Sequence, residues 1–305
     1  MTAPHPFGRC LVLTGATGSG KSALALELAP ALNAEIVSMD SMAVYRGFDI
    51  GTAKPSVEER IRVPHHLIDE LDPWESASVA WWLERVRSAV ADIESRGRRA
   101  LIVGGTPLYL KALARGLFRG PPANAALREA LEAEAARSGS TVLHARLAQF
   151  DPLAAARIHP NDLKRIVRAL EVLTETGRPV SDWQREWLDM AAGGPDIVCL
   201  DCPRAELYER INVRVIAMLE AGWLDEARRL RDLPRGPSRE AAAAVGYREL
   251  WEFLDGARSW SETVVRIQQR TRQFAKRQLT WFRRLPECHF ATAELTRTRW
   301  TMKMA

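Results

Sequence analysis

The chain begins with short apolar runs separated by longer helix-forming stretches. The run at 10–14 (CLVLT) is apolar, rich in β-branched residues and ends in a glycine cluster, which is typical of a buried strand. The next stretch, 21–32, predicts a helix with Pro30 near its end. Further strands are expected at 35–38, 65–69 and 100–105, with another helix over 78–95. Because strands that alternate with helices form parallel sheets, the pattern predicts an α/β fold.

The pattern changes after Gly116. A Gly- and Pro-rich break at 116–122 is followed by helix-forming sequence from 124 to 189, in which no strand is evident. We therefore expect an all-helical insertion at 121–194.

The last third of the chain returns to the earlier pattern. The run at 196–201 (DIVCLD) predicts another strand, and long helices are expected over 204–230 and 239–284. We therefore expect residues 1–120 and 195–305 to form one α/β core with helices at its C-terminal end.

Composition indicates a soluble globular protein. The 305 residues are 47% hydrophobic and 27% charged, and no apolar run approaches the roughly 18 residues of a membrane helix. The first ten residues lack the apolar region of a secretory signal, and four scattered cysteines are too few for a disulfide framework. We expect a cytoplasmic protein without a membrane partner or an obligate protein partner, and a monomer.

Positive charge is concentrated near the C-terminus. The net charge is +5, and the stretch 264–284 holds seven positive residues and no Asp or Glu, with Phe274, Trp281 and Phe282 interleaved. Such a run is often a solvated helix face. A helix of this kind can also pack on one side and bind phosphates on the other.

Residues 15–22 match the phosphate-binding pattern G-x-x-x-x-G-K-[ST] between a predicted strand and a predicted helix. Glycines let backbone N–H groups surround phosphate oxygens, the helix N-terminus adds positive potential, and Lys21 adds a mobile charge. The Ser22 hydroxyl is placed to bind Mg²⁺. The motif predicts a P-loop NTPase-like core whose phosphate ligands are Gly15, Ala16, Thr17, Gly18, Ser19, Gly20, Lys21 and Ser22.

A carboxylate expected near this loop is Asp40, just after the second predicted strand. Ligands of open parallel sheets bind at the carboxyl edge of the strands, so Asp40 is a candidate magnesium ligand or general base. A helix N-cap is the alternative. The fourth predicted strand ends in Gly104-Gly105 without the acid of an NTP hydrolase, and Asp69 is only a weak candidate for that acid.

Several segments together resemble the tRNA dimethylallyltransferase (IPP transferase) family. The resemblance extends from about residue 11 to 284, and the motifs follow the family's order. They are the phosphate loop, 40–55 (DSMAVYRGFDIGTAKP), 104–109 (GGTPLY), 159–162 (HPND) with 164–171 (KRIVRALE), and 272–283 (RQFAKRQLTWFR).

The resemblance implies a prenyltransferase that moves a dimethylallyl group from dimethylallyl diphosphate to tRNA. The acceptor would be the exocyclic amine of the adenosine immediately 3′ of the anticodon, and the phosphate loop would hold diphosphate with Mg²⁺. By the family's pattern Asp40 is the base, while Lys21 and Thr106 act at the reacting centre. Arg128 resembles a further diphosphate or tRNA contact, or is simply a solvated arginine.

The resemblance also implies contacts with the anticodon arm of tRNA. The acceptor base must leave its stack, as base-modifying enzymes commonly require. Many members carry glutamine where this chain has Ala43, so a base-reading role of that side chain is absent. The implied tRNA contacts are Asp40, Ser41, Met42, Ala43, Thr106, Arg128, Lys164, Arg165, Ile166, Val167, Arg168, Arg272, Lys276 and Arg277.

Three other functions remain as alternatives. An adenylate prenyltransferase modifies free nucleotides and needs neither the helical insertion nor the basic helix. A small-molecule kinase would use the same loop for ATP, and an RNA-binding protein without activity would leave the loop and Asp40 unused. The pairs His65-His66 and Cys199/Cys202 are interpreted as structural, because the first lacks further metal ligands and the second does not open a helix.

Overall fold

The computed structural model describes residues 5–117, 120–185 and 193–302. The chain forms two compact units. The first, called the core unit, consists of 1–114 and 193–305, and the second, called the helical unit, is 115–192. None of the described helices combines the length and the apolar character needed to cross a membrane.

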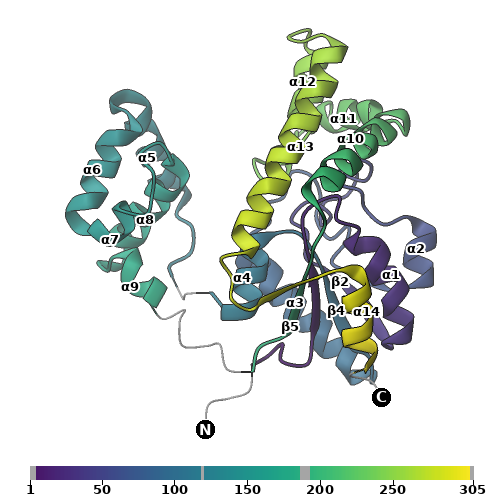
Figure 1. Cartoon of the computed structure of the whole chain (residues 1–305). Helices are drawn as coiled ribbons and strands as arrows, with labels where there is room; N and C mark the ends of the chain where they lie inside the picture. Colours follow the sequence, from purple (N-terminus) through teal and green to yellow (C-terminus); the bar gives the residue numbers. More distant parts are fainter. Residues whose placement is uncertain (1–4, 118–119, 186–192, 303–305) are drawn as a thin grey trace. The chain divides into compact units, whose positions relative to one another are not determined.

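Parallel strands form the centre of the core unit (Figure 1). Their order in the sheet is β3-β2-β4-β1-β5-β6. All four residues of β1 are buried between its neighbours β4 and β5. The predicted α/β fold with a parallel sheet is therefore confirmed. The strands are β1 Leu11–Thr14, β2 Ala34–Ser38, β3 His65–His66, β4 Arg99–Gly104, β5 Asp196–Leu200 and β6 Cys288–Ala291.

Two strands differ from the prediction. β3 has two residues rather than five, because Leu67 and Asp69 adopt left-handed backbone conformations with φ of 61° and 57°. β6 was not predicted, since its four residues are only partly buried or exposed and show no apolar run. It forms an edge of the sheet, beside β5.

Helices of the core unit pack on the sheet and on one another. Those of the first half are α1 Lys21–Ala31, α2 Val57–Arg62, α3 Val79–Ser95 and α4 Pro107–Arg115, and α14 Ala293–Met302 packs on α1. Ser78 caps α3 by accepting a hydrogen bond from Trp81 N. Trp82 donates its indole N–H to Ser38 O and stacks on Tyr109, with ring centroids 4.3 Å apart. These contacts hold α3 and α4 against the end of β2.

The long helices predicted near the C-terminus are interrupted. The first divides at Gly222, which has φ of 97°, and the second divides into a 3₁₀ turn, α12 and α13. Ser259 and Glu262 form a capping box that starts α13. The elements are α10 Arg204–Glu220, α11 Trp223–Arg231, η2 Ala241–Ala243, α12 Tyr247–Leu254 and α13 Trp260–Phe282.

The helical unit is built from short helices around an apolar core. Buried Asp151 accepts hydrogen bonds from Ala154 N and Ser181 N, so one carboxylate satisfies the N-termini of two helices. The strongly amphipathic α8 buries one face in this core. The helices are α5 Ala125–Ser138, α6 Ser140–Phe150, α7 Pro152–Ala155, α8 Leu163–Thr176 and α9 Val180–Arg185.

Candidate active site

The phosphate loop connects β1 to α1, as the sequence predicts. Gly18 and Gly20 have φ of 82° and 90°, values that glycine adopts without the strain of a Cβ atom. Gly20 directly precedes the first turn of α1, so the N–H groups of that turn, which have no partner within the helix, lie at the end of the loop. The backbone is thus shaped for an anionic ligand.

Lys21 begins α1 and points into a cavity of about 470 Å³ in the core unit. Its ammonium nitrogen Nζ lies 3.3 Å from Ala16 O. The pKa of Lys21 is lowered to about 8, chiefly by burial and then by the charge of Arg214, while the charge of Asp40 opposes the shift. Lys21 is therefore mostly protonated at neutral pH and lacks an ion-pair partner among the described residues, which suits it to an anionic ligand.

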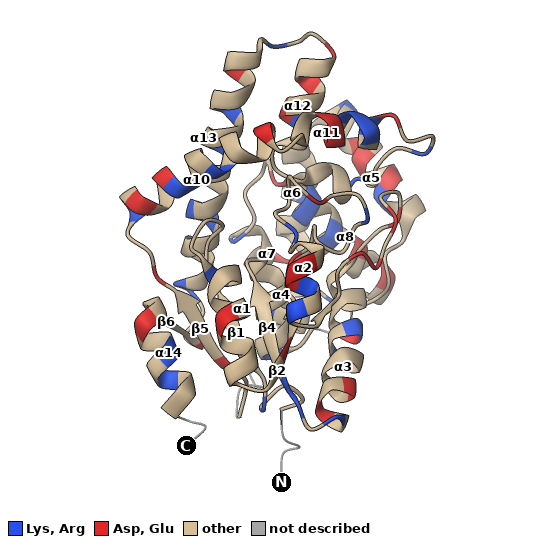
Figure 2. Cartoon of the chain, turned by 90° about the vertical axis from the view of Figure 1, so that its right-hand side faces the viewer, with Lys and Arg blue, Asp and Glu red and all other residues tan. Residues whose placement is uncertain are grey.

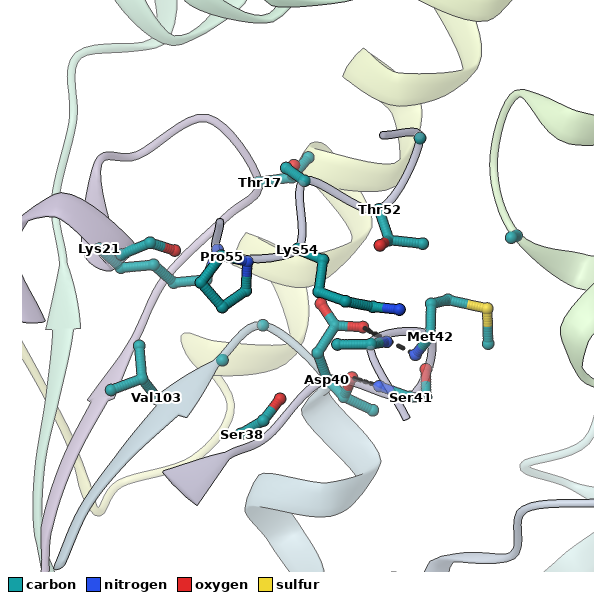
Figure 3. A pocket seen from close by; sticks show the side chains of 18 of the residues that line it. Thr17, Lys21, Ser38, Asp40, Ser41, Met42, Thr52, Lys54, Pro55 and Val103 are labelled. Carbon is teal, nitrogen blue, oxygen red and sulfur yellow. Dashed lines mark hydrogen bonds between the residues drawn. The ribbon is translucent and has the colours of Figure 1, made fainter. Parts of the chain in front are cut away.

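Asp40 lies at the end of β2 and lines the same cavity, as Figure 3 shows. Its Oδ1 accepts hydrogen bonds from Met42 N at 2.8 Å and Ala43 N at 3.4 Å. A turn follows rather than a helix, so the helix N-cap interpretation is wrong. Among the described residues, Oδ2 has no hydrogen-bond partner and remains able to accept a proton.

Thr106 holds the turn after Asp40. Its hydroxyl accepts a hydrogen bond from Ser41 N at 3.1 Å, and its own N–H donates to Met39 O at 3.4 Å. Thr106 follows β4, the neighbour of β2 in the sheet. The structure therefore brings Thr106 and Asp40 together, as the sequence led us to expect.

Arg214 is a site residue that the sequence interpretation missed. It lies on α10 and lines the cavity with Lys21 and Asp40. Burial lowers the pKa of its guanidinium, and the charge of Asp40 opposes this shift. Among the described residues, the guanidinium of Arg214 has no hydrogen-bond or ion-pair partner. A usable signal was present, because Ile211 and Val215 mark the buried face of α10 on which Arg214 lies.

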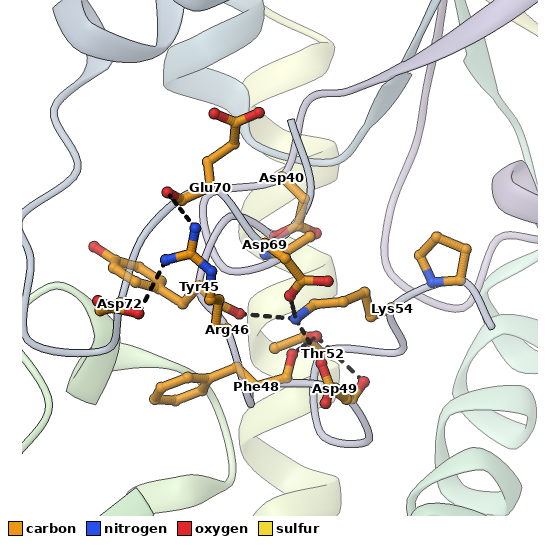
Figure 4. A network of polar contacts seen from close by, with 12 residues as sticks. Asp40, Tyr45, Arg46, Phe48, Asp49, Thr52, Lys54, Asp69, Glu70 and Asp72 are labelled. Carbon is orange, nitrogen blue, oxygen red and sulfur yellow. Dashed lines mark hydrogen bonds and ion pairs between the residues drawn. The ribbon is translucent and has the colours of Figure 1, made fainter. Parts of the chain in front are cut away.

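The loop between β2 and α2 lines one side of the cavity and is held by Lys54 (Figure 4). The Lys54 side chain is only 1% exposed, and its Nζ contacts Tyr45 O at 2.7 Å, Asp49 Oδ1 at 2.6 Å and Asp69 Oδ1 at 2.7 Å. Burial favours a higher pKa of Asp69, but hydrogen bonds from Lys54 and Arg60 outweigh it and lower the pKa. Asp69 therefore belongs to this ion-pair cluster.

A second anchor of this loop is Glu226 on α11. Its buried carboxylate accepts hydrogen bonds from the backbone N–H groups of Asp49, Ile50 and Gly51, at 3.1, 2.8 and 3.1 Å. The Tyr247 hydroxyl donates a further hydrogen bond at 2.6 Å. Four donors therefore satisfy one buried charge, and the segment that lines the cavity is fixed to the C-terminal helices.

Arg128 and Arg168 form ion pairs within the helical unit. The Nε and Nη2 atoms of Arg128 lie 2.8 and 2.9 Å from the two carboxylate oxygens of Glu171. Arg168 also pairs with Glu171 and donates to Pro121 O at 2.9 Å. Hydrogen bonds from both arginines lower the pKa of Glu171 despite its burial. Both arginines thus have structural partners, and their contact with diphosphate or tRNA stays a prediction.

The other candidates on α8 divide between surface and core. Lys164 and Arg165 are exposed and accessible to a polyanion. Ile166 and Val167 are 0% and 3% exposed and pack in the core of the helical unit. The predicted tRNA contact of these two side chains is therefore wrong, because a helix turns them to the face opposite its exposed residues.

The basic helix is α13, along which positive residues recur without acidic ones after its first turn (Figure 2). Lys276 and Arg277 are exposed, and the guanidinium of Arg277 lies 5.8 Å from the ring centroid of Phe274. Arg272 is half-buried and donates to Asn212 Oδ1 at 2.5 Å. Phe274 also lines the cavity, so one helix carries both cavity residues and surface cations.

The histidine and cysteine pairs have structural surroundings. His66 Nε2 lies 2.6 Å from Glu35 Oε2, and His65 Nδ1 lies 2.7 Å from Val63 O. The described residues include no cluster of three or more His, Cys, Asp or Glu suited to a metal ion. Cys199 and Cys202 are free thiols whose pKa values burial raises, opposite to the shift that a reactive thiolate requires.

The site combines a phosphate loop, two cavity-lining cations that have no ion-pair partner among the described residues, and a carboxylate at the carboxyl edge of a parallel sheet. These features define a P-loop α/β enzyme. Comparison with known proteins is more specific. The family described as IPP transferase matches residues 43–285. The chain belongs to this family.

Relatives match most of the chain. It is 47% identical to a tRNA dimethylallyltransferase of Syntrophobacter fumaroxidans, over 92% of this chain and 84% of the relative. It is 50% identical to one of Symbiobacterium thermophilum, over 90% and 86% of the two chains. Among solved structures, the tRNA isopentenylpyrophosphate transferase of Bacillus halodurans is 37% identical with a TM-score of 0.70, covering 97% of this chain and 95% of that one. A eukaryotic dimethylallyltransferase acting on tRNA has a TM-score of 0.78 at 28% identity, and the match covers 93% of this chain and 73% of that one.

Proposed function

We propose that this enzyme transfers the dimethylallyl group of dimethylallyl diphosphate to the exocyclic amine of the tRNA adenosine immediately 3′ of the anticodon. The observation that carries the proposal is the shared cavity of Lys21 and Asp40. One end offers cations and backbone donors to a diphosphate, and the other offers a carboxylate to a nucleophile. The relatives described above carry the name of this activity.

The donor end stabilises the leaving group. As the bond between the allylic carbon and oxygen breaks, negative charge develops on the departing diphosphate. Lys21, Arg214 and the N–H groups of the phosphate loop supply positive potential there. Because neither cation has an ion-pair partner among the described residues, both charges are available to the diphosphate.

The acceptor end activates a weak nucleophile. The lone pair of an exocyclic adenine amine is delocalised into the ring, so the amine gains nucleophilicity when its proton is removed as the C–N bond forms. Asp40 accepts this proton on Oδ2, while Oδ1 stays bonded to the turn. Thr106 keeps the turn in place through Ser41 N. The products are the N-alkylated base, diphosphate and a protonated Asp40, which then releases its proton to solvent.

The chain is suited to hold Mg²⁺ through Ser22. The Ser22 hydroxyl lines the cavity beside Lys21 and has no hydrogen-bond partner among the described residues. Mg²⁺ commonly keeps few protein ligands and takes its remaining ligands from substrate phosphates and water, which fits a site with one hydroxyl. When bound, the ion neutralises part of the charge on the diphosphate.

The tRNA binds through exposed cations. Lys164 and Arg165 on α8, and Lys276 and Arg277 on α13, are accessible to backbone phosphates. Sequence-specific proteins favour unpaired RNA loops, whose bases can be turned out and stacked on side chains. The turn that follows Asp40 lines the cavity, and we expect it to contact the extruded base.

Label transfer tests the proposal directly. The enzyme is incubated with Mg²⁺ and radiolabelled dimethylallyl diphosphate, and with unmodified tRNA or AMP in separate reactions. Label in tRNA alone is the expected result. Label in AMP would instead identify an adenylate prenyltransferase. Label in neither acceptor would contradict the proposal and favour the small-molecule kinase alternative.

A further inference from the structure

Gln278 makes the contact that links three parts of the active site. It lies on α13 and is only 3% exposed. Its Oε1 accepts a hydrogen bond from Thr17 N of the phosphate loop at 2.9 Å, and its Nε2 donates one to Gly105 O at 2.7 Å. One side chain therefore joins α13, the phosphate loop and the segment after β4.

The surroundings of Gln278 are specific for an amide. A buried side chain that bonds both an N–H and a C=O must carry an acceptor and a donor, which glutamine provides in its neutral form. Gly105 has no side chain, and a Cβ atom there would lie 2.6 Å from Gln278 Nε2 and 3.1 Å from Gly15 O. The absence of that Cβ lets the amide approach the backbone.

The two hydrogen bonds join the two backbone segments that carry the proposed site residues. Thr17 belongs to the loop for the diphosphate, and Gly105 precedes Thr106, whose hydroxyl holds the turn after Asp40. We propose that Gln278 is a positioning residue that holds the phosphate loop and the Thr106 segment at a fixed separation. The allylic carbon and the acceptor amine then meet in reacting geometry. This inference rests on the proposed function.

The expected signature is a loss of kcat that exceeds any rise in KM. Gln278→Met keeps the length and volume of the side chain but removes both hydrogen bonds. Since small displacements of reacting groups can cost about 100-fold in rate, we expect kcat to fall about 10- to 100-fold. The KM for dimethylallyl diphosphate should change less than about threefold, because Lys21 and Arg214 remain. The matched control is Gln273→Met, which alters an exposed glutamine of the same helix and should stay within about twofold of wild type.

Gln278→Glu gives a second test within a single protein. A protonated glutamic acid has one O–H donor and one carbonyl acceptor, so it can reproduce both bonds, whereas the carboxylate cannot donate to Gly105 O. Burial raises the pKa of such an introduced carboxyl group. Its activity relative to wild type should therefore rise as pH falls from 8 to 6, while the ratio for Gln278→Met stays flat.

Dividing the activity of each variant by that of the wild type at the same pH cancels the effect of ionisable groups that all three proteins share. The ionisable groups that line the same cavity are Lys21, Asp40, Lys54, Glu59, His65 and Arg214. Thermal unfolding measured alongside establishes that each variant is folded at the assay temperature.

Two results would overturn the inference. One is a Gln278→Met enzyme with wild-type kcat. The other is a Gln278→Glu enzyme whose activity relative to wild type does not depend on pH. An inactive wild-type enzyme in the label-transfer assay would instead contradict the proposed function, so the two failures are distinguishable.

Discussion

Replacing Asp40 by asparagine removes the proposed base with little change in shape. The Asn side-chain oxygen can still accept the hydrogen bonds from Met42 N and Ala43 N, so the turn is preserved. The atom in place of Oδ2 becomes an NH₂ group, which cannot accept the proton of the adenine amine. The perturbation is therefore chemical rather than structural.

The expected loss can be bounded. Removal of a general base typically costs about 10²- to 10⁴-fold in rate, or about 3 to 5 kcal/mol of transition-state stabilisation. A second effect is electrostatic. The negative charge of Asp40 raises the pKa of Lys21, so its removal moves that pKa below about 8. We therefore expect diphosphate binding to weaken in the variant, but by much less than transfer, because the charge of Asp40 is only one of several influences on this pKa.

The assay combines single-turnover transfer at pH 7 with separate measurements of tRNA and dimethylallyl diphosphate binding. We expect transfer to fall at least 100-fold while tRNA affinity stays within about twofold. Asp92→Asn is the control, since Asp92 is an exposed residue of α3 whose side chain forms an ion pair with Arg96 at the end of that helix. Equal losses of transfer and of tRNA binding would refute the role of Asp40 as a base and make it a structural residue.

Three further predictions concern the cations. Lys21→Ala should raise the Kd for dimethylallyl diphosphate at least tenfold. In the wild type this affinity should fall as pH rises through about 8, where Lys21 loses its proton; a titration flat from pH 7 to 9 would contradict the assignment. Arg214→Ala should raise the same Kd about tenfold with tRNA binding unchanged, as measured by isothermal titration, and an unaltered Kd would remove Arg214 from the diphosphate site. Neutralising Arg272, Lys276 and Arg277 together should lower the slope of log K for tRNA against log salt concentration by about two to three, and an unchanged slope would exclude α13 from the tRNA contact.

Local sequence determined the features that depend on neighbouring residues. A buried strand, a glycine-rich loop and a helix specify the phosphate loop within 12 residues, from Leu11 to Ser22, because the geometry needs only adjacent backbone. Asp40 was found in the same way, since it lies two residues after the end of a buried strand. The alternation of strands and helices likewise predicted the parallel sheet.

The tertiary structure decided the contacts between distant segments. Gln278 bonds Thr17 across 261 residues of sequence, and Glu226 bonds the loop at Asp49 across 177. Neither pairing leaves a local pattern, because a buried amide or carboxylate takes partners from whichever backbone the fold brings to it. Arg214 is an intermediate case: the buried positions Ile211 and Val215 indicated its face of α10, but the packing of α10 on α13 and the phosphate loop decided that this face lines the cavity. The sequence by itself therefore determined the chemistry of the loop and of Asp40, and the fold decided which distant side chains hold them in position.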